Sequence, residues 1–244
     1  MFEGRATEHE LLDAPDCTPQ LAAASYRFME LVNARFGGIA VVRQFLAQQR
    51  ARGVNGHGET PLHVLDIGSG SCDIPLAVSR WARRQGRAIR FTCLEPAASA
   101  AHIARERLAA TPDPAIRLLQ EDAFAHEPAE PYDCAVSSMC FHHLGDEEIL
   151  RLLAHLRHQV RGPVLINDLL RSRCSSLATR GLLAVVGAPA GVRHDALLSI
   201  RRGFRPDELA ALLKRLPDST STVRTAPFFR VAAVVKFNDP ESNP

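Results

Sequence analysis

The feature that most restricts the fold of this chain is an alternation of short apolar segments with amphipathic ones, which begins at Leu62. Apolar runs predict strands at residues 62–67, 89–94, 116–119, 132–138 and 163–167. Apolar residues at three- and four-residue spacing predict helices between them, at residues 74–84, 97–109 and 146–160. The strands are apolar on both faces, as expected of parallel strands covered by helices. This order predicts an α/β fold with a doubly wound parallel sheet.

The end of the chain departs from this alternation. Residues 220–225 and 228–237 have the composition of two further strands, and only Ala226 and Pro227 separate them. So short a connection makes an antiparallel hairpin, because parallel neighbours need a long crossover. The sequence therefore predicts a mostly parallel sheet of seven strands (five and then two) with a C-terminal antiparallel hairpin.

Two helical segments precede the first strand. Residues 18–33 and 38–49 carry apolar side chains at helical spacing, and a turn-rich loop follows at residues 53–58. We expect a helical N-terminal cap over residues 1–58, followed by the main domain over residues 59–244.

A long segment at about residues 169–206 lies between the fifth strand and the hairpin. Insertions of this kind often carry substrate specificity, so a lid-like role is expected. The apolar stretch at residues 181–187 suits a lid over a substrate, and it equally suits core packing or a dimer interface. Arg35 and Arg43 of the cap are expected near the opposite side of the same pocket.

The charge of the chain is nearly balanced, with a formal net charge of +2 over 244 residues and no block of like charge. Nucleic acid and an anionic membrane are therefore not expected as partners. The six cysteines are scattered without a C-x-x-C pair or a zinc-type spacing. Reduced thiols, no metal ligands and metal-independent chemistry are expected. Because the N-terminus has no apolar signal-peptide core, we expect a soluble, cytoplasmic protein, as a monomer or a homodimer.

The connection after the first strand is rich in glycine and acidic residues. It reads Asp66-Ile-Gly68-Ser69-Gly70-Ser-Cys72-Asp73. Glycines here let the backbone approach a ligand, and the turn opens a helix for which Asp73 is the expected N-cap. The G-x-G-x-x-G pattern of dinucleotide sites would need a third glycine where Asp73 stands. Two carboxylates at this turn favour a cationic ligand over a diphosphate.

Polar residues also follow the next three strands. Glu95 and Pro96 end the second strand, and a carboxylate there can accept hydrogen bonds from two ribose hydroxyls. After the third strand come Asp122, which can accept from an adenine amino group, then Ala123 and Phe124 beside the ring. The fourth strand ends at Ser137 and Ser138, which should face the same crevice.

Together these residues resemble the class I S-adenosylmethionine-dependent methyltransferases, over residues 62–237. Cys72 replaces the third glycine of the first motif of the family. The resemblance implies a Rossmann-like fold with S-adenosyl-L-methionine as cofactor. It places Ser137 near the methionine part or the sulfonium. It implies a cofactor site made of Asp66, Gly68, Ser69, Gly70, Asp73, Glu95, Pro96, Asp122, Ala123, Phe124, Ser137 and Ser138.

More narrowly, the chain resembles bacterial small-molecule methyltransferases of the quinone-biosynthesis branch, some of which accompany polyketide pathways. The similar stretches are residues 10–13 with 32–35, then 141–144, 166–171, 193–195 and 199–204. This resemblance implies O-methylation of a phenolic or polyketide-like acceptor. C-methylation of a quinone precursor and a non-catalytic cofactor-binding scaffold are the alternatives. A nicotinamide-dependent oxidoreductase is disfavoured by Asp73 and the terminal hairpin.

A phenolic acceptor benefits from a base, and histidine suits that role near neutral pH. His142 and His143 follow the fourth strand, and only one of them is expected to reach the site, because neighbouring residues point in different directions. His194 is a further candidate, although Asp195 beside it reads equally well as the N-cap of a helix over residues 196–200. Arg201 and Arg202 are expected either to hold an acidic substrate or to end a solvated helix.

Overall fold

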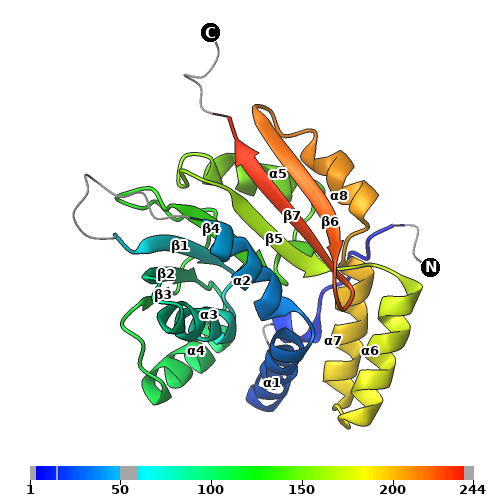
Figure 1. Cartoon of the computed structure of the whole chain (residues 1–244). Coiled ribbons are helices and arrows are strands. Elements are labelled where there is room, and N and C mark those ends of the chain that lie inside the picture. Colours follow the sequence, from blue (N-terminus) through cyan, green and yellow to red (C-terminus); the bar gives the residue numbers. More distant parts are fainter. Residues whose placement is uncertain (1–3, 15, 50–59, 239–244) are drawn as a thin grey trace.

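The computed structural model describes residues 4–14, 16–49 and 60–238. It contains one seven-stranded sheet in the order β3-β2-β1-β4-β5-β7-β6, drawn in Figure 1. The first five strands pair in parallel, and β7 is antiparallel to both β5 and β6. The predicted fold class is confirmed. The strands are β1 (Leu62–Ile67), β2 (Ile89–Leu94), β3 (Ile116–Leu119), β4 (Cys134–Ser138), β5 (Val164–Leu169), β6 (Ser219–Ala226) and β7 (Arg230–Phe237).

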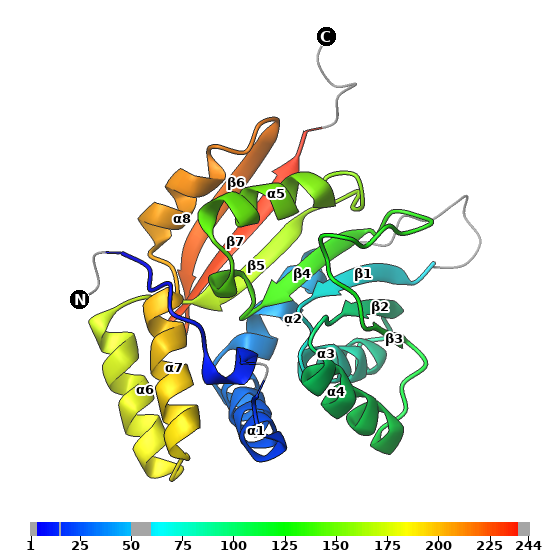
Figure 2. The same cartoon turned by 180° about the vertical axis from the view of Figure 1, so that it is seen from behind.

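Helices cover both faces of the sheet. One face is seen from the front in Figure 1 and carries α2, α3 and α4, while α5 and α8 lie on the face seen in Figure 2. Each face has its own buried apolar cluster, as a doubly wound sheet requires. The helices are α1 (Pro19–Arg35), α2 (Gly38–Gln48), α3 (Asp73–Arg84), α4 (Ala98–Ala110), α5 (Asp146–Leu156), α6 (Arg173–Val185), α7 (Ala190–Arg202) and α8 (Pro206–Leu213).

The first two helices are integrated with the sheet to different degrees. Val42 and Leu46 of α2 are fully buried in the same cluster as Val64 of β1, so α2 helps to cover the sheet. Helix α1 instead contacts α2, α4 and α7, and lies across the carboxyl ends of the parallel strands (Figure 2). The loop predicted at residues 53–58 lies outside the described residues, as does the boundary expected between the cap and the main domain.

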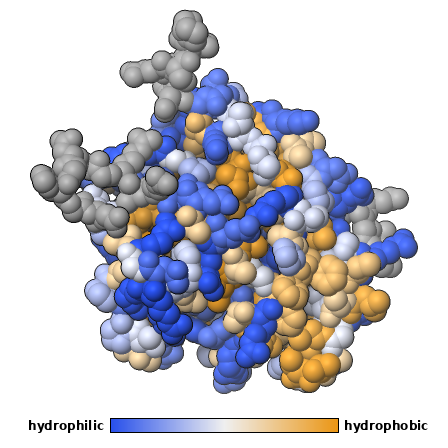
Figure 3. Space-filling view, in the orientation of Figure 1, coloured by the Kyte–Doolittle hydropathy of each residue, from blue (hydrophilic) through white to orange (hydrophobic). Residues whose placement is uncertain are grey.

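The insertion between β5 and the hairpin is helical. Helices α6 and α7 lie side by side, and Leu183 and Val192 pack with Leu21 and Phe28 of α1. The opposite side of α6 is exposed, with Val185 at 86% exposure and Leu177 at 72%, within the apolar area that Figure 3 shows over this helix. Among the residues described, none of the helices combines the length and apolar character needed to cross a bilayer.

The hairpin turn is longer than the sequence suggests. Strand β7 begins at Arg230 and not at residue 228, so Pro227, Phe228 and Phe229 form the turn. Both phenylalanines have positive φ angles, of 60° and 58°. Sequence reasoning assigns aromatic residues to strands and could not predict this left-handed backbone. The turn brings both rings to the cavity described below.

We expect opposite effects from two glycine-to-alanine changes in the insertion. A methyl group on Gly203 would lie 2.5 Å from the carbonyl oxygen of Leu169, because α7 ends directly against β5. Gly203→Ala should therefore lower the free energy of unfolding by about 1–3 kcal/mol. Gly181 lies within α6 with open space around it, so Gly181→Ala should raise that free energy by about 0.5–1 kcal/mol. Urea unfolding of both variants tests this, and equal effects would contradict the close approach.

Candidate active site

The glycine turn after β1 has a left-handed backbone at three positions. Gly68, Gly70 and Cys72 have φ angles of 66°, 53° and 56°. A methyl group on Gly68 would lie 2.5 Å from Sγ of Cys140, so a larger residue does not fit there without a shift. Cys72, and not Asp73 as predicted, is the N-cap of α3. Its buried side chain packs in the core, at a backbone cost of about 1–2 kcal/mol for a non-glycine residue.

Glu95 holds this turn in place. Its carboxylate accepts hydrogen bonds from the backbone N–H of Gly70 at 2.8 Å and of Ala97 at 2.9 Å. The side chain is buried at the end of β2, and burial raises its pKa. Each carboxylate oxygen can accept a further hydrogen bond, so Glu95 can contact a ligand and position the turn at the same time.

Asp66 and Asp73 are buried beside the same turn. Burial raises the pKa of Asp66 to about 7, although Ser69 Oγ donates to its carboxylate at 2.7 Å. Burial also raises the pKa of Asp73, which accepts a hydrogen bond from Asn33 Nδ2 at 3.1 Å. A cation bound at this turn would offset the cost of burying these carboxylates.

One cavity of about 510 Å³ opens between the turn, α1, the α6–α7 pair and the hairpin turn. Much of its wall is apolar, including Phe28, Phe36, Leu182 and Phe229. Its lining includes ten of the residues that the sequence nominates, namely Asp66, Gly68, Ser69, Gly70, Asp73, Glu95, Pro96, Ser138, His142 and His143.

Five nominated residues are not among those that line this cavity: Asp122, Ala123, Phe124, Ser137 and His194. Asp122 is exposed and accepts a hydrogen bond from the backbone N–H of Phe124 at 3.0 Å. Ala123 is buried in the core. Ser137 is buried and donates to the carbonyl of Ile67 at 3.0 Å, so it supports the turn from below. Their roles toward a cofactor stay predictions.

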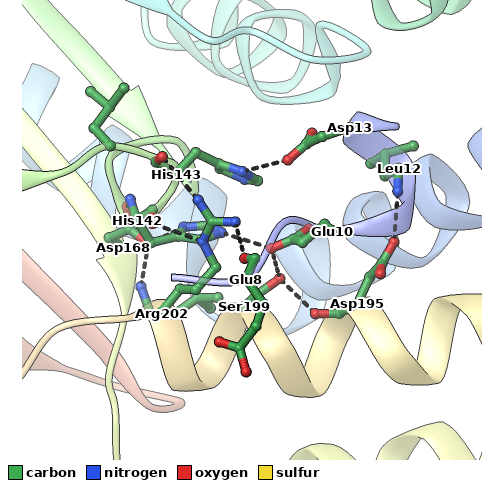
Figure 4. A network of polar contacts seen from close by, with 12 residues as sticks. Glu8, Glu10, Leu12, Asp13, His142, His143, Asp168, Asp195, Ser199 and Arg202 are labelled. Carbon is green, nitrogen blue, oxygen red and sulfur yellow. Dashed lines mark hydrogen bonds and ion pairs between the residues drawn. The ribbon is translucent and has the colours of Figure 1, made fainter. Parts of the chain in front are cut away.

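Both histidines after β4 reach the cavity, whereas the sequence predicted only one. They lie in a 3₁₀ turn, η2 (Phe141–His143), with ring centroids 4.2 Å apart. Such a turn does not send neighbouring side chains to opposite sides as a strand does. Figure 4 shows both rings facing residues 10–13 of the N-terminal segment.

His142 is the more enclosed of the two. Its Nδ1 lies 2.7 Å from Oδ1 of Asp168 in β5, and its Nε2 lies 3.6 Å from Oε1 of Glu10. Burial alone would lower the pKa of His142, but the two carboxylates raise it to about 9. Burial alone would raise the pKa of Glu10, but its contacts with His142, His143 and Ser199 together lower it to about 2. Nε2 of His142 has no hydrogen-bond partner within the described part of the chain.

His143 is partly exposed and is oriented by a different carboxylate. Its Nδ1 lies 3.0 Å from Oδ2 of Asp13, which belongs to the short helix η1 (Leu11–Asp13). This contact leaves Nε2 of His143 available for a ligand in the cavity. We call Glu10, Asp13, His142 and His143 the histidine cluster.

Asp195 takes another role than the predicted helix cap, while a catalytic role for His194 stays a prediction. Asp195 lies inside α7 and caps no helix; its carboxylate accepts hydrogen bonds from the backbone N–H groups of Leu11 and Leu12, both at 2.9 Å. Helix α7 begins six residues earlier than expected, at Ala190, so no cap is needed at Asp195. The side chain of His194 is 56% exposed, with its Nδ1 3.0 Å from Asp195.

Arg202 is buried, so it is not the solvated helix end that was one of its two expected roles. It donates to the backbone carbonyls of His142, His143 and Glu8, at 3.2, 2.9 and 2.7 Å. Arg202 therefore fixes the histidine turn to the N-terminal segment (Figure 4). Arg201 is exposed and pairs with Glu8.

Sequence reasoning assigned no role to several residues of the site. Glu10, Asp13 and Asp168 lie within the stretches that carry the narrower resemblance, so a signal was present. Tyr26 covers Gly70, where a methyl group would lie 3.3 Å from its ring. Arg230 is buried at the cavity wall and donates to Asn33 at 3.1 Å. Neither its strand position nor its charge indicated this contact.

The buried Asp66 should make stability depend on pH. Its folded-state pKa of about 7 lies above the ordinary value of 3.8, so the stability that it contributes is complete at low pH and is lost as the pH rises to about 7. The Asp66→Asn variant has no carboxyl group to ionise at this position, so it should not lose stability in this way as the pH rises. The free energy of unfolding of the variant minus that of the wild type should therefore be roughly 2–3 kcal/mol larger at about pH 8 than at about pH 5, measured by urea unfolding. An identical difference at both pH values would contradict the shift.

Comparisons with known proteins agree with this geometry. Residues 64–162 match a family model described as a methyltransferase domain. No curated protein sequence is significantly similar to the chain. The plantazolicin methyltransferase BpumL, solved with a pentazolic desmethylPZN analog and SAH, has a TM-score of 0.67 at 17% identity over 94% of this chain and 93% of its own. Magnesium protoporphyrin IX methyltransferase from Synechocystis PCC 6803 with bound SAM has a TM-score of 0.52 at 10% identity, over 83% of this chain and 78% of its own.

The matched residues span the glycine turn, Glu95 and the histidine turn, and the structural similarity extends over 94% of the chain. Residues 64–162 thus match a methyltransferase domain, and the chain shares the fold of methyltransferases that were solved with bound SAM or SAH.

Proposed function

We propose that the chain transfers the methyl group of S-adenosylmethionine to the hydroxyl oxygen of a small phenolic or polyketide-like acceptor. One observation carries this proposal: the glycine turn and the histidine cluster line the same largely apolar cavity. Cofactor and acceptor can therefore meet within it. The reaction needs this arrangement because it is a direct displacement, in which alignment and exclusion of water supply much of the rate.

The cofactor end of the cavity suits a nucleoside with a cationic tail. Asp66 and Asp73 favour the sulfonium and the α-amino group, because both groups carry positive charge. We assign Glu95 to the ribose hydroxyls, since its carboxylate already lies against the turn with acceptor capacity to spare. Tyr26 of α1 covers the turn, so this helix would close over the bound cofactor.

The acceptor end of the cavity is lined by elements that lie outside the parallel strands of the sheet. Side chains come from α1, α6, α7 and the hairpin turn, and they include Met29, Val32, Leu182, Val192, Ile200 and Phe228. Aromatic and aliphatic side chains of this kind suit an apolar acceptor body. They would also keep water away from the methyl group.

The histidine cluster is the polar end at which we place the acceptor hydroxyl. In the transfer the acceptor oxygen forms a bond to the methyl carbon while the bond from carbon to sulfur breaks, and the sulfur keeps the electron pair. A phenolate attacks more readily than a phenol, so the hydroxyl proton must leave first. His143 is the more exposed of the two histidines in the cavity, and its Nε2 is available because Asp13 contacts only its Nδ1, whereas Nε2 of His142 faces Glu10.

The cofactor assignment is tested by calorimetric titration with S-adenosylhomocysteine. We expect micromolar binding to the wild type, and binding about 10–100-fold weaker to Glu95→Ala, because two hydrogen bonds to a charged acceptor are lost. Glu106→Ala, at an exposed position of α4, should bind as the wild type does. Equal affinity of the wild type and the Glu95 variant would contradict the assignment, and NADH should not bind.

The methylated atom is tested with a pair of acceptors, a phenol and its methyl ether. O-methylation predicts turnover of the phenol alone, because the ether has no free oxygen nucleophile. C-methylation predicts that a product with a new carbon–carbon bond forms from either compound. Mass spectrometry of the products separates the two outcomes, and a ring-methylated product would replace our proposal with the alternative.

A further inference from the structure

We propose that Glu10, His142 and His143 form a binding site for one divalent first-row transition-metal ion. One ligand atom from each residue lies within 4.8 Å of the other two. Oε1 of Glu10 and Nε2 of His142 are 3.6 Å apart, close to the separation of about 3.4 Å between two ligands of a tetrahedral zinc ion. About 130 positions separate Glu10 from the adjacent His142 and His143, so the sequence spacing conceals the set.

The strongest indication is that every ligand has its own supporting partner. Asp168 lies 2.7 Å from Nδ1 of His142, and Asp13 lies 3.0 Å from Nδ1 of His143. A carboxylate on the far nitrogen of a histidine is the usual second contact of a metal-bound imidazole, because it fixes the ring and raises its basicity. Glu10 is held by the hydroxyl of Ser199 at 2.6 Å.

A second indication is independent of this clustering. The His142 side chain is 1% exposed, and its Nε2 has no hydrogen-bond partner among the residues described. Without an ion, this nitrogen carries a proton and faces Glu10 at 3.6 Å, beyond hydrogen-bond distance; a bound ion would displace that proton and take over the positive charge between the two side chains. Here the atom faces the Glu10 carboxylate across a gap suited to an ion. Figure 4 shows the Glu10 carboxylate lying below the two rings.

Two histidines and one carboxylate select the kind of ion. Imidazole ligands favour zinc, iron or cobalt over magnesium or calcium, which prefer oxygen ligands. Three protein ligands leave a coordination position open, as in catalytic sites. The ion site itself does not depend on the proposed function, but its role does: a metal-bound acceptor hydroxyl would lose its proton to solvent more readily. His143 would then act as a ligand.

The test is titration of the chelator-treated chain with Co²⁺, followed by its visible absorption, and with Zn²⁺ by calorimetry. We expect one ion per chain. Glu10→Gln and His142→Ala should each weaken binding by more than about 100-fold, because a direct ligand is lost. Asp168→Asn should weaken it by about 10–100-fold as a positioning residue. His102→Ala removes an exposed histidine from α4 and should leave the stoichiometry unchanged.

Binding of S-adenosylhomocysteine to each variant reports whether the fold and the cofactor site are intact. Variants that bind S-adenosylhomocysteine normally but have lost Co²⁺ support the ion site. No stoichiometric Co²⁺ or Zn²⁺ binding to the wild type, or equal binding to the Glu10 and His142 variants, overturns it. A chain that binds the ion but not S-adenosylhomocysteine would instead contradict the proposed function and leave the ion site standing.

Discussion

The arrangement of the site depends on one buried ionic contact, in which His142 lies between the carboxylates of Glu10 and Asp168. Glu10 comes from the N-terminal segment, His142 from the turn after β4, and Asp168 from β5. Burying either carboxylate without a cationic partner would cost several kcal/mol. The contact therefore fixes three parts of the chain relative to one another. Once Glu10 is placed, the following N–H groups reach Asp195, and Arg202 holds the histidine turn from behind.

The cofactor side of the cavity is held by a separate set of contacts that also reach the N-terminal helices. Arg230 of β7 donates to Asn33 of α1, and Asn33 donates to Asp73 at the start of α3. This chain of contacts joins the hairpin to the glycine turn through α1. The cavity thus has a rigid floor at the sheet and a wall that the N-terminal helix supplies. A methyltransferase gains from such a wall, because the reacting sulfonium must be kept from water.

The fold could be predicted from the sequence because it depends on local patterns. Apolar strands, amphipathic helices and the glycine-rich turn at the end of β1 are all visible in short windows of the sequence. The hairpin was predicted but not the conformation of its turn, because the left-handed backbone of Phe228 and Phe229 contradicts their intrinsic preference for strands. Asp195 was misread for a related reason: an aspartate before an apolar run resembles a cap, while its true partners lie over 180 positions away.

The site was only partly predictable. Motifs nominated the glycine turn, Glu95 and the histidine pair, each of which follows a strand of the parallel sheet. The residues that give these groups their chemistry come from distant segments: Asp13 and Glu10 from the N-terminal segment, Asp168 from β5. The expectation that the chain has no metal ligand set was based on spacing along the sequence. Sequence spacing cannot indicate a set such as Glu10, His142 and His143, whose members come together only in the folded chain.

The central claim is that cofactor and acceptor share the cavity between the glycine turn and the histidine cluster. A crystal structure with bound S-adenosylhomocysteine tests it most directly. Our account predicts the ribose hydroxyls within hydrogen-bond distance of Glu95 and the sulfur directed toward His143. Density for the ligand at any other place, or a ligand whose sulfur points away from the histidine cluster, would contradict it.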